Sequence, residues 1–159
     1  MFSHSIKTGF SFGVTSGIIT TLGLMVGLNS TTHSELVVVG GIFIIAIADA
    51  MSDALGIHMS EESENKHSPA EIWASTICTF LAKFLVAMTF VVPVLLLSLS
   101  TAILVSIIWA VFLLTLLTYF VAKGEGQGPL NAIFEHLVVA GVVVCLAEAV
   151  GRMIARIFS

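Results

Sequence analysis

The apolar stretch from Ile77 to Val121 limits most strongly how this chain can fold. Within it, Lys83 is the only charged side chain. At 1.5 Å per residue, one helix of this length would be roughly twice as long as the hydrocarbon core of a bilayer is thick. The chain is therefore expected to cross a membrane, turn, and cross it again. Pro93 and the polar segment 98–101 predict where it turns.

The composition of the whole chain agrees with several such crossings. Of its 159 residues, 57% are hydrophobic and 10% are charged, whereas soluble domains contain about 25% charged residues. So few charges cannot cover a soluble surface. We expect an all-α, polytopic membrane protein in which residues 1–159 form a single transmembrane domain, a bundle of five helices. The predicted spans are 9–28, 36–60, 70–97, 101–122 and 130–158.

The charge balance and the motifs exclude other classes of protein. A net charge of −4 with six Lys and Arg leaves no basic surface for nucleic acid. Cys78 and Cys145 lie within apolar runs and form neither a CxxC motif nor a disulfide framework. The spans contain no HExxH or GxSxG motif and no Ser/His/Asp grouping, so an enzyme is not expected.

Five spans place the two termini on opposite sides of the membrane. Three lysines fall on the N-terminal side and two arginines on the other: Lys7, Lys66 and Lys123 against Arg152 and Arg156. Because cytoplasmic loops carry an excess of basic residues, this distribution favours a cytoplasmic N-terminus.

The second predicted span carries acidic residues inside the membrane, where ionisable groups are costly and indicate function. At about 100° per residue, one helix face holds Asp49, Asp53, Gly56, Ser60 and Glu64, with Glu61 at its edge. Carboxylate oxygens are the ligands that hard divalent cations prefer. We predict an ion site at Asp49 and Asp53, with Ser60, Glu61 and Glu64 leading to it. For the glutamates, a solvated helix end is an equal alternative.

Two further charged groups bear on this site. Two carboxylates on adjacent turns are not expected to be ionised together without a cation, and an arriving divalent cation would expel protons. Lys83 is expected to face the pair and to compete with the metal, the alternative being that it snorkels to the interface. Glu148 and Arg152 in the fifth span form an i, i+4 pair, either as a simple ion pair or in transport coupling.

The first predicted span carries five glycines within about 120° of a helical wheel, and Ser16 shares their face. These are Gly9, Gly13, Gly17, Gly23 and Gly27. Such a glycine seam lets another helix backbone approach closely. The partner helix could belong to the same chain or to a second one. Our hypothesis is that the seam forms the subunit interface of a homodimer.

Two segments resemble the vacuolar iron transporter family of divalent-metal transporters. Residues 16–23, Ser-Gly-Ile-Ile-Thr-Thr-Leu-Gly, are similar to the first-span pattern Asp-Gly-Leu/Ile-Val-Thr-Thr. Residues 52–60, Ser-Asp-Ala-Leu-Gly-Ile-His-Met-Ser, are similar to the second-span pattern Ser-Met-Ala-x-Gly-Glu-Tyr-x-Ser. The acidic residue of the first pattern falls at Ser16, the methionine of the second at Asp53 and its glutamate at Ile57.

The resemblance implies a homodimer of five-helix subunits that exports Fe²⁺ or Mn²⁺ from the cytosol in exchange for protons. The metal would be the substrate, and no permanently bound cofactor is expected. Only residues 61–69 stand where some members carry a cytosolic metal-binding domain. The metal site would be rebuilt around Asp49 and Asp53, with Ser16 beside it. We expect a prokaryotic cell membrane, with a vacuolar-type membrane as the alternative. The alternative function is a non-transporting scaffold or a metal-sensing module.

Overall fold

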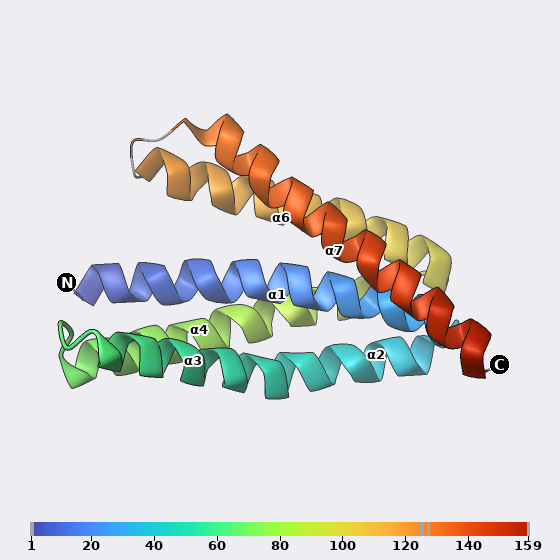
Figure 1. The fold of residues 1–159 in the computed structure, drawn as a ribbon, viewed down its shortest axis with the longest axis horizontal. Coiled ribbons are helices and arrows are strands. Elements are labelled where there is room, and N and C mark those ends of the chain that lie inside the picture. The colour runs from blue at the N-terminus through green and yellow to red at the C-terminus, as the bar shows by residue number, and fades with distance from the viewer. Residues whose placement is uncertain (1, 125, 127, 159) are drawn as a thin grey trace.

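The computed structural model describes residues 2–124, 126 and 128–158, and its elements are helices that run nearly side by side (Figure 1). The second long helix is continuous but contains a π-helical turn, η1. The elements are α1 (Phe2–Thr32), α2 (Glu35–Ile44), η1 (Ile45–Asp49), α3 (Ala50–Ser63), α4 (Pro69–Thr89), α5 (Val91–Leu96), α6 (Leu99–Gly124) and α7 (Pro129–Phe158).

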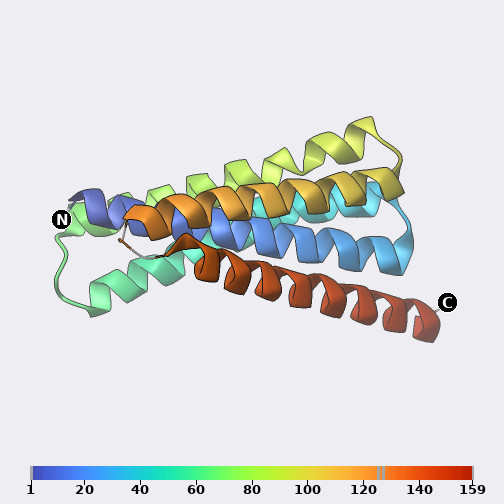
Figure 2. The same ribbon diagram turned by 90° about the horizontal axis from the view of Figure 1, so that it is seen from above.

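Five helical segments are long and apolar enough to cross a membrane, which confirms the all-α, five-span prediction. They are His4–Thr32, Glu35–Ser63, Pro69–Leu96, Leu99–Gly124 and Pro129–Phe158. The first helix begins earlier than the predicted span because the polar residues before Gly9 continue it. Figures 1 and 2 both show the N- and C-termini at opposite ends of the bundle.

The turn in the long apolar stretch lies where the sequence predicts it. α4 ends at Thr89, and the short helix α5 carries Pro93, which has no N–H to donate to the preceding turn. Leu97 is extended, with φ −127° and ψ 160°, and α6 begins two residues later. The chain thus reverses direction between two spans within a few residues.

α1 is the central helix of the bundle, with α4 along one side and α7 across its C-terminal half (Figure 1). The core around it is apolar and includes the fully buried Ile18, Met25, Ile42 and Phe90. The α6–α7 hairpin packs against α1 near the C-terminal end and diverges from it toward the N-terminal end (Figure 1).

The glycine seam divides between two neighbours within the chain. A Cβ on Gly13 would lie 2.5 Å from the Thr79 carbonyl oxygen, and one on Gly17 would lie 3.2 Å from that of Lys83. Farther along α1, a Cβ on Gly23 would lie 2.9 Å from Val143 Cγ1 in α7. Gly9 also faces α4, and Gly27 also faces α7. The hypothesis that this seam forms a subunit interface is therefore wrong, because helices of the same chain already fill it.

The replacement Gly13→Ala is expected to lower the Tm of the detergent-purified protein. The added methyl would push α1 away from α4, and overpacking of this kind costs about 1–3 kcal/mol. The matched control is Gly40→Ala in α2, because nothing lies within 4 Å of a Cβ there. Removing a helical glycine at an open position gains about 0.5–1 kcal/mol, so the control should raise the Tm. Equal shifts for both variants would contradict the close α1–α4 contact.

Candidate ion site

Lys83 is the centre of the candidate ion site and is completely buried. It belongs to a column of buried polar residues that recur every four positions on the face of α4 toward α1: Glu71, Ser75, Thr79 and Lys83. Most of this column is satisfied locally. Ser75 and Thr79 donate to carbonyl oxygens of α4 itself, and Glu71 caps the start of the helix by accepting hydrogen bonds from Ser68. Lys83 has no such local partner and reaches other helices.

The Lys83 ammonium group contacts three oxygen atoms from two other helical segments. Its Nζ donates to Asp53 Oδ2 at 2.6 Å and to Ser16 Oγ at 2.9 Å. Asp49 Oδ2 lies 2.5 Å from Nζ as an ion pair, without the angles of a hydrogen bond. The Ser16 hydroxyl in turn donates to Asp53 Oδ2 at 2.6 Å. An ammonium group has three N–H donors, and three oxygens surround this one.

Local features of three segments bring these side chains together. Gly17 allows α1 to approach the Lys83 backbone, which places the neighbouring Ser16 beside the ammonium group. Asp49 is the last residue of η1, and Asp53 lies one turn later in α3. Single π-helical turns within α-helices are frequent at functional sites. The two carboxylates therefore face α4 from consecutive turns, as the helical periodicity predicts.

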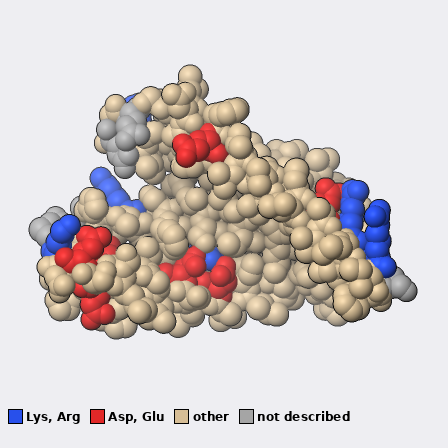
Figure 3. Space-filling model, viewed as in Figure 1, with Lys and Arg blue, Asp and Glu red and all other residues tan. Residues whose placement is uncertain are grey.

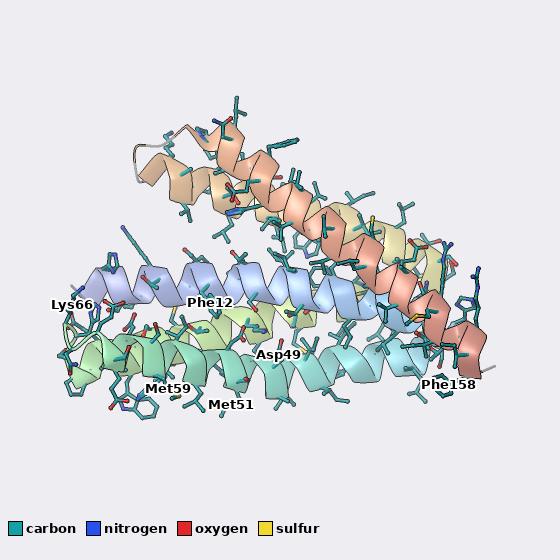
Figure 4. All side chains as sticks on the ribbon, in the orientation of Figure 1. Phe12, Asp49, Met51, Met59, Lys66 and Phe158 are labelled. Carbon is teal, nitrogen blue, oxygen red and sulfur yellow. The ribbon has the colours of Figure 1, made fainter. Side chains whose placement is uncertain are left out.

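The charges of the site are distributed unevenly with respect to the surface. The Lys83 side chain is 0% exposed, whereas the side chains of Asp49 and Asp53 are 37% and 20% exposed. Figure 4 shows Asp49 midway along the bundle, and Figure 3 shows acidic atoms on the surface at that place. Two carboxylates against one ammonium leave a formal negative charge, partly exposed near mid-span. Such a site attracts cations.

The site differs from a ready-made metal cage. Within residues 2–124, 126 and 128–158, no three His, Cys, Asp or Glu side chains are grouped so that they could hold a metal ion. Asp49, Asp53 and the Ser16 hydroxyl could supply oxygen ligands, but all three contact Lys83. A cation that uses these three oxygens, Asp49 Oδ2, Asp53 Oδ2 and Ser16 Oγ, therefore competes with Lys83 for them.

The other predicted site residues lie apart from this cluster. Ser60 and Glu64 are exposed, and Glu64 forms an ion pair with Lys66 at 3.7 Å. Glu61 is buried, and its Oε2 has no partner among the described residues. It lies two helical turns, roughly 12 Å, from Asp53. The structure thus brings together Asp49, Asp53, Ser16 and Lys83, and leaves the three residues near the helix end outside.

Glu148 and Arg152 form the predicted i, i+4 ion pair on α7. Both side chains are largely exposed, and neither is in contact with the Lys83 cluster. From this position, Glu148 and Arg152 do not directly neutralise the charges of Asp49, Asp53 and Lys83.

Sequence reasoning missed the π-helical turn and the polar column on α4. The column had a readable signal, because Glu71, Ser75, Thr79 and Lys83 are spaced four apart and therefore share one helix face. That spacing predicts the side of α4 from which Lys83 points.

Comparison with known proteins gives one match. The model of the VIT family matches residues 10–73, which contain Ser16, Asp49 and Asp53 and end before Lys83. A search of curated proteins and a search of solved structures found no match. The VIT family is a family of transporters, not of enzymes, and its members move metal ions across membranes. Over these residues the chain is similar to the VIT family, the vacuolar iron transporter family.

Proposed function

We propose that the protein is a secondary transporter that moves a divalent metal cation, Fe²⁺ or Mn²⁺, out of the cytosol in exchange for protons. The observation that carries the proposal is the buried contact of Lys83 with both Asp49 and Asp53. A lysine held this way occupies the cation site of the resting protein. It neutralises part of the acidic charge that would otherwise be unfavourable at mid-span.

The cycle follows from this competition for the carboxylates. A divalent cation that approaches from the exposed side of Asp49 carries twice the charge of Lys83 and can displace its ammonium group from the shared oxygens. When the cation leaves, Lys83 returns to the carboxylates and prevents the site from remaining unpaired. Protons as the counter-substrate come from the resemblance to the family, because the exchange of Lys83 for a metal ion does not itself release a proton.

The choice of metal and the orientation rest on different observations. The resemblance to the family supports Fe²⁺ and Mn²⁺ as the metals. The candidate ligands are oxygens, which discriminate between these two ions less than sulfur ligands would, so the site tolerates both. For orientation, Lys7, Lys66 and Lys123 lie at the N-terminal end of the bundle, whereas Arg152 and Arg156 lie at the other. This supports a cytoplasmic N-terminus in the cell membrane of a prokaryote.

A homodimer belongs to the same proposal. Asp49 is 37% exposed on the outer surface of the isolated chain, where hydrocarbon would meet a carboxylate. An acidic side chain that is exposed to lipid raises the free energy of the protein. A second copy packed over this face would replace lipid with protein and a hydrated path. The proposal therefore puts the dimer interface at the face that carries Asp49, and it is supported by the filling of the glycine seam within the chain.

Purified protein in sealed proteoliposomes tests the proposal. We expect uptake of Mn²⁺ and Fe²⁺ that increases when the vesicle lumen is more acidic than the outside, so that protons leave as the metal enters. We expect little uptake of Ca²⁺ or Na⁺. Empty vesicles and dissipation of the gradient by an ionophore are the controls. Light scattering on the same sample should give the mass of two chains. A folded protein that binds metal but moves none under any gradient would support the alternative, a metal-sensing module.

A further inference from the structure

A groove of about 700 Å³ lies between α1 and α6, near the N-terminal end of the bundle. It is present because the α6–α7 hairpin diverges from α1 at this end, and Figure 3 shows the hollow between the two parts. Farther from the helix ends the walls are largely apolar, with Phe10, Leu117 and Phe120 among the lining residues. The volume is in the range of sites that hold small molecules, about 300–1,000 Å³.

The outer end of the groove is basic. His4 and Lys7 line it on the α1 side, and Gly124 lines it where α6 ends. Lys123 is not among the lining residues: its Nζ lies over the ring of Tyr119, 5.7 Å from its centre, on another face of α6. Among the described residues that line the groove, none is acidic. An apolar groove with a lysine at the membrane-water boundary is complementary to a phospholipid with an acidic headgroup.

We propose that this groove binds an anionic phospholipid. The acyl chain lies along Phe10, Leu117 and Phe120, and the phosphate lies at Lys7, beside His4. A groove between spans cannot stay empty in a bilayer, since lipid chains surround it on the open side. Basic pockets between transmembrane helices recognise acidic headgroups, and each lysine near the surface contributes about 1 kcal/mol.

Charge complementarity favours a lipid over a second copy of the chain. A second copy related by twofold symmetry would bring its own basic groove end, with His4 and Lys7, toward the same end of the membrane. A phosphate instead neutralises these groups. The lipid would also support the divergent hairpin, because it fills the space in which α6 has no contact with α1.

The test compares lipids that copurify after extraction from vesicles of phosphatidylcholine with and without phosphatidylglycerol. Native mass spectrometry counts the lipids on each protein. We expect the wild type to retain phosphatidylglycerol in preference to phosphatidylcholine. Lys7→Gln should reduce that preference about fivefold, the ratio for one lysine contact. The matched control is Lys66→Gln, which removes the same charge at the same end of the bundle but outside the groove.

A second variant separates the apolar part of the groove from its charge. Ser11→Trp fills the lining beside Phe10 without changing the net charge, so it should reduce retention of both lipids. Three results would overturn the proposal. The first is equal retention of the two lipids by the wild type, and the second is an equal loss of the preference for phosphatidylglycerol in Lys66→Gln and Lys7→Gln. The third is a wild-type dimer without bound lipid that dissociates when Ser11→Trp is introduced, because a second copy would then fill the groove. None of these readouts depends on transport, so the proposal can fail while the transport function stands.

Discussion

Asp53→Asn is expected to abolish metal uptake in proteoliposomes while leaving the protein folded. The amide keeps the volume of the side chain, and its oxygen can still accept hydrogen bonds from Lys83 and Ser16. Both of these groups donate to Asp53 Oδ2 at 2.6 Å. It cannot supply a negative charge to a cation. Mutation of a residue that only supports a metal ligand lowers metal affinity or activity by about 10–100-fold. Loss of a ligand itself should therefore reduce uptake by about 100-fold or more.

The control for Asp53→Asn makes the same chemical change outside the site. Glu64→Gln removes an acidic charge from an exposed residue whose ion pair with Lys66 spans 3.7 Å. Exposed pairs contribute little, so both the uptake and the Tm should stay at wild-type values. The double variant Asp49→Asn/Asp53→Asn provides the decisive result. If it carries metal at the normal rate, the two aspartates are not the transport site.

Much of the fold could be predicted from the sequence because the bilayer permits few solutions. Every backbone polar group of a span has to be satisfied inside the membrane, so long apolar runs are helices. The apolar stretch around Pro93 could only be two spans joined by a turn, and the structure has the turn at Leu97 and Ser98. The positions of Asp49 and Asp53 on one face also followed from helical periodicity alone.

The partner of each helix face could not be predicted in the same way. A run of glycines permits close packing but does not identify the helix that approaches, which is why the seam was assigned to a second subunit when α4 and α7 fill it. In the second span, helical periodicity placed Ser60 and Glu64 on the same face as Asp53. It did not show which positions of that face a neighbouring helix covers, and both residues are exposed.

Lys83→Met is expected to make the stability of the protein depend on metal. Methionine keeps an unbranched apolar side chain of similar length but leaves Asp49 and Asp53 without a cation. Removing one partner of a buried ion pair costs about 3–5 kcal/mol, less here because Asp49 is partly exposed. Without metal, the Tm of the variant should therefore fall below that of the wild type.

Added Mn²⁺ should then restore the Tm of Lys83→Met far more than it raises that of the wild type, because no ammonium group competes for the carboxylates. At a concentration 100 times its Kd, a ligand stabilises the protein it binds by about 2.7 kcal/mol, which corresponds to a rise of roughly 5–10 °C for a chain of this size. The triple variant Asp49→Asn/Asp53→Asn/Lys83→Met keeps the apolar replacement but has no carboxylates, so it should show no response to Mn²⁺. A variant with Lys83→Met alone that is insensitive to metal would mean that Lys83 only neutralises the aspartates. A strong response, together with slower uptake than in the wild type, would mean that the lysine keeps metal affinity low enough for release on the other side of the membrane.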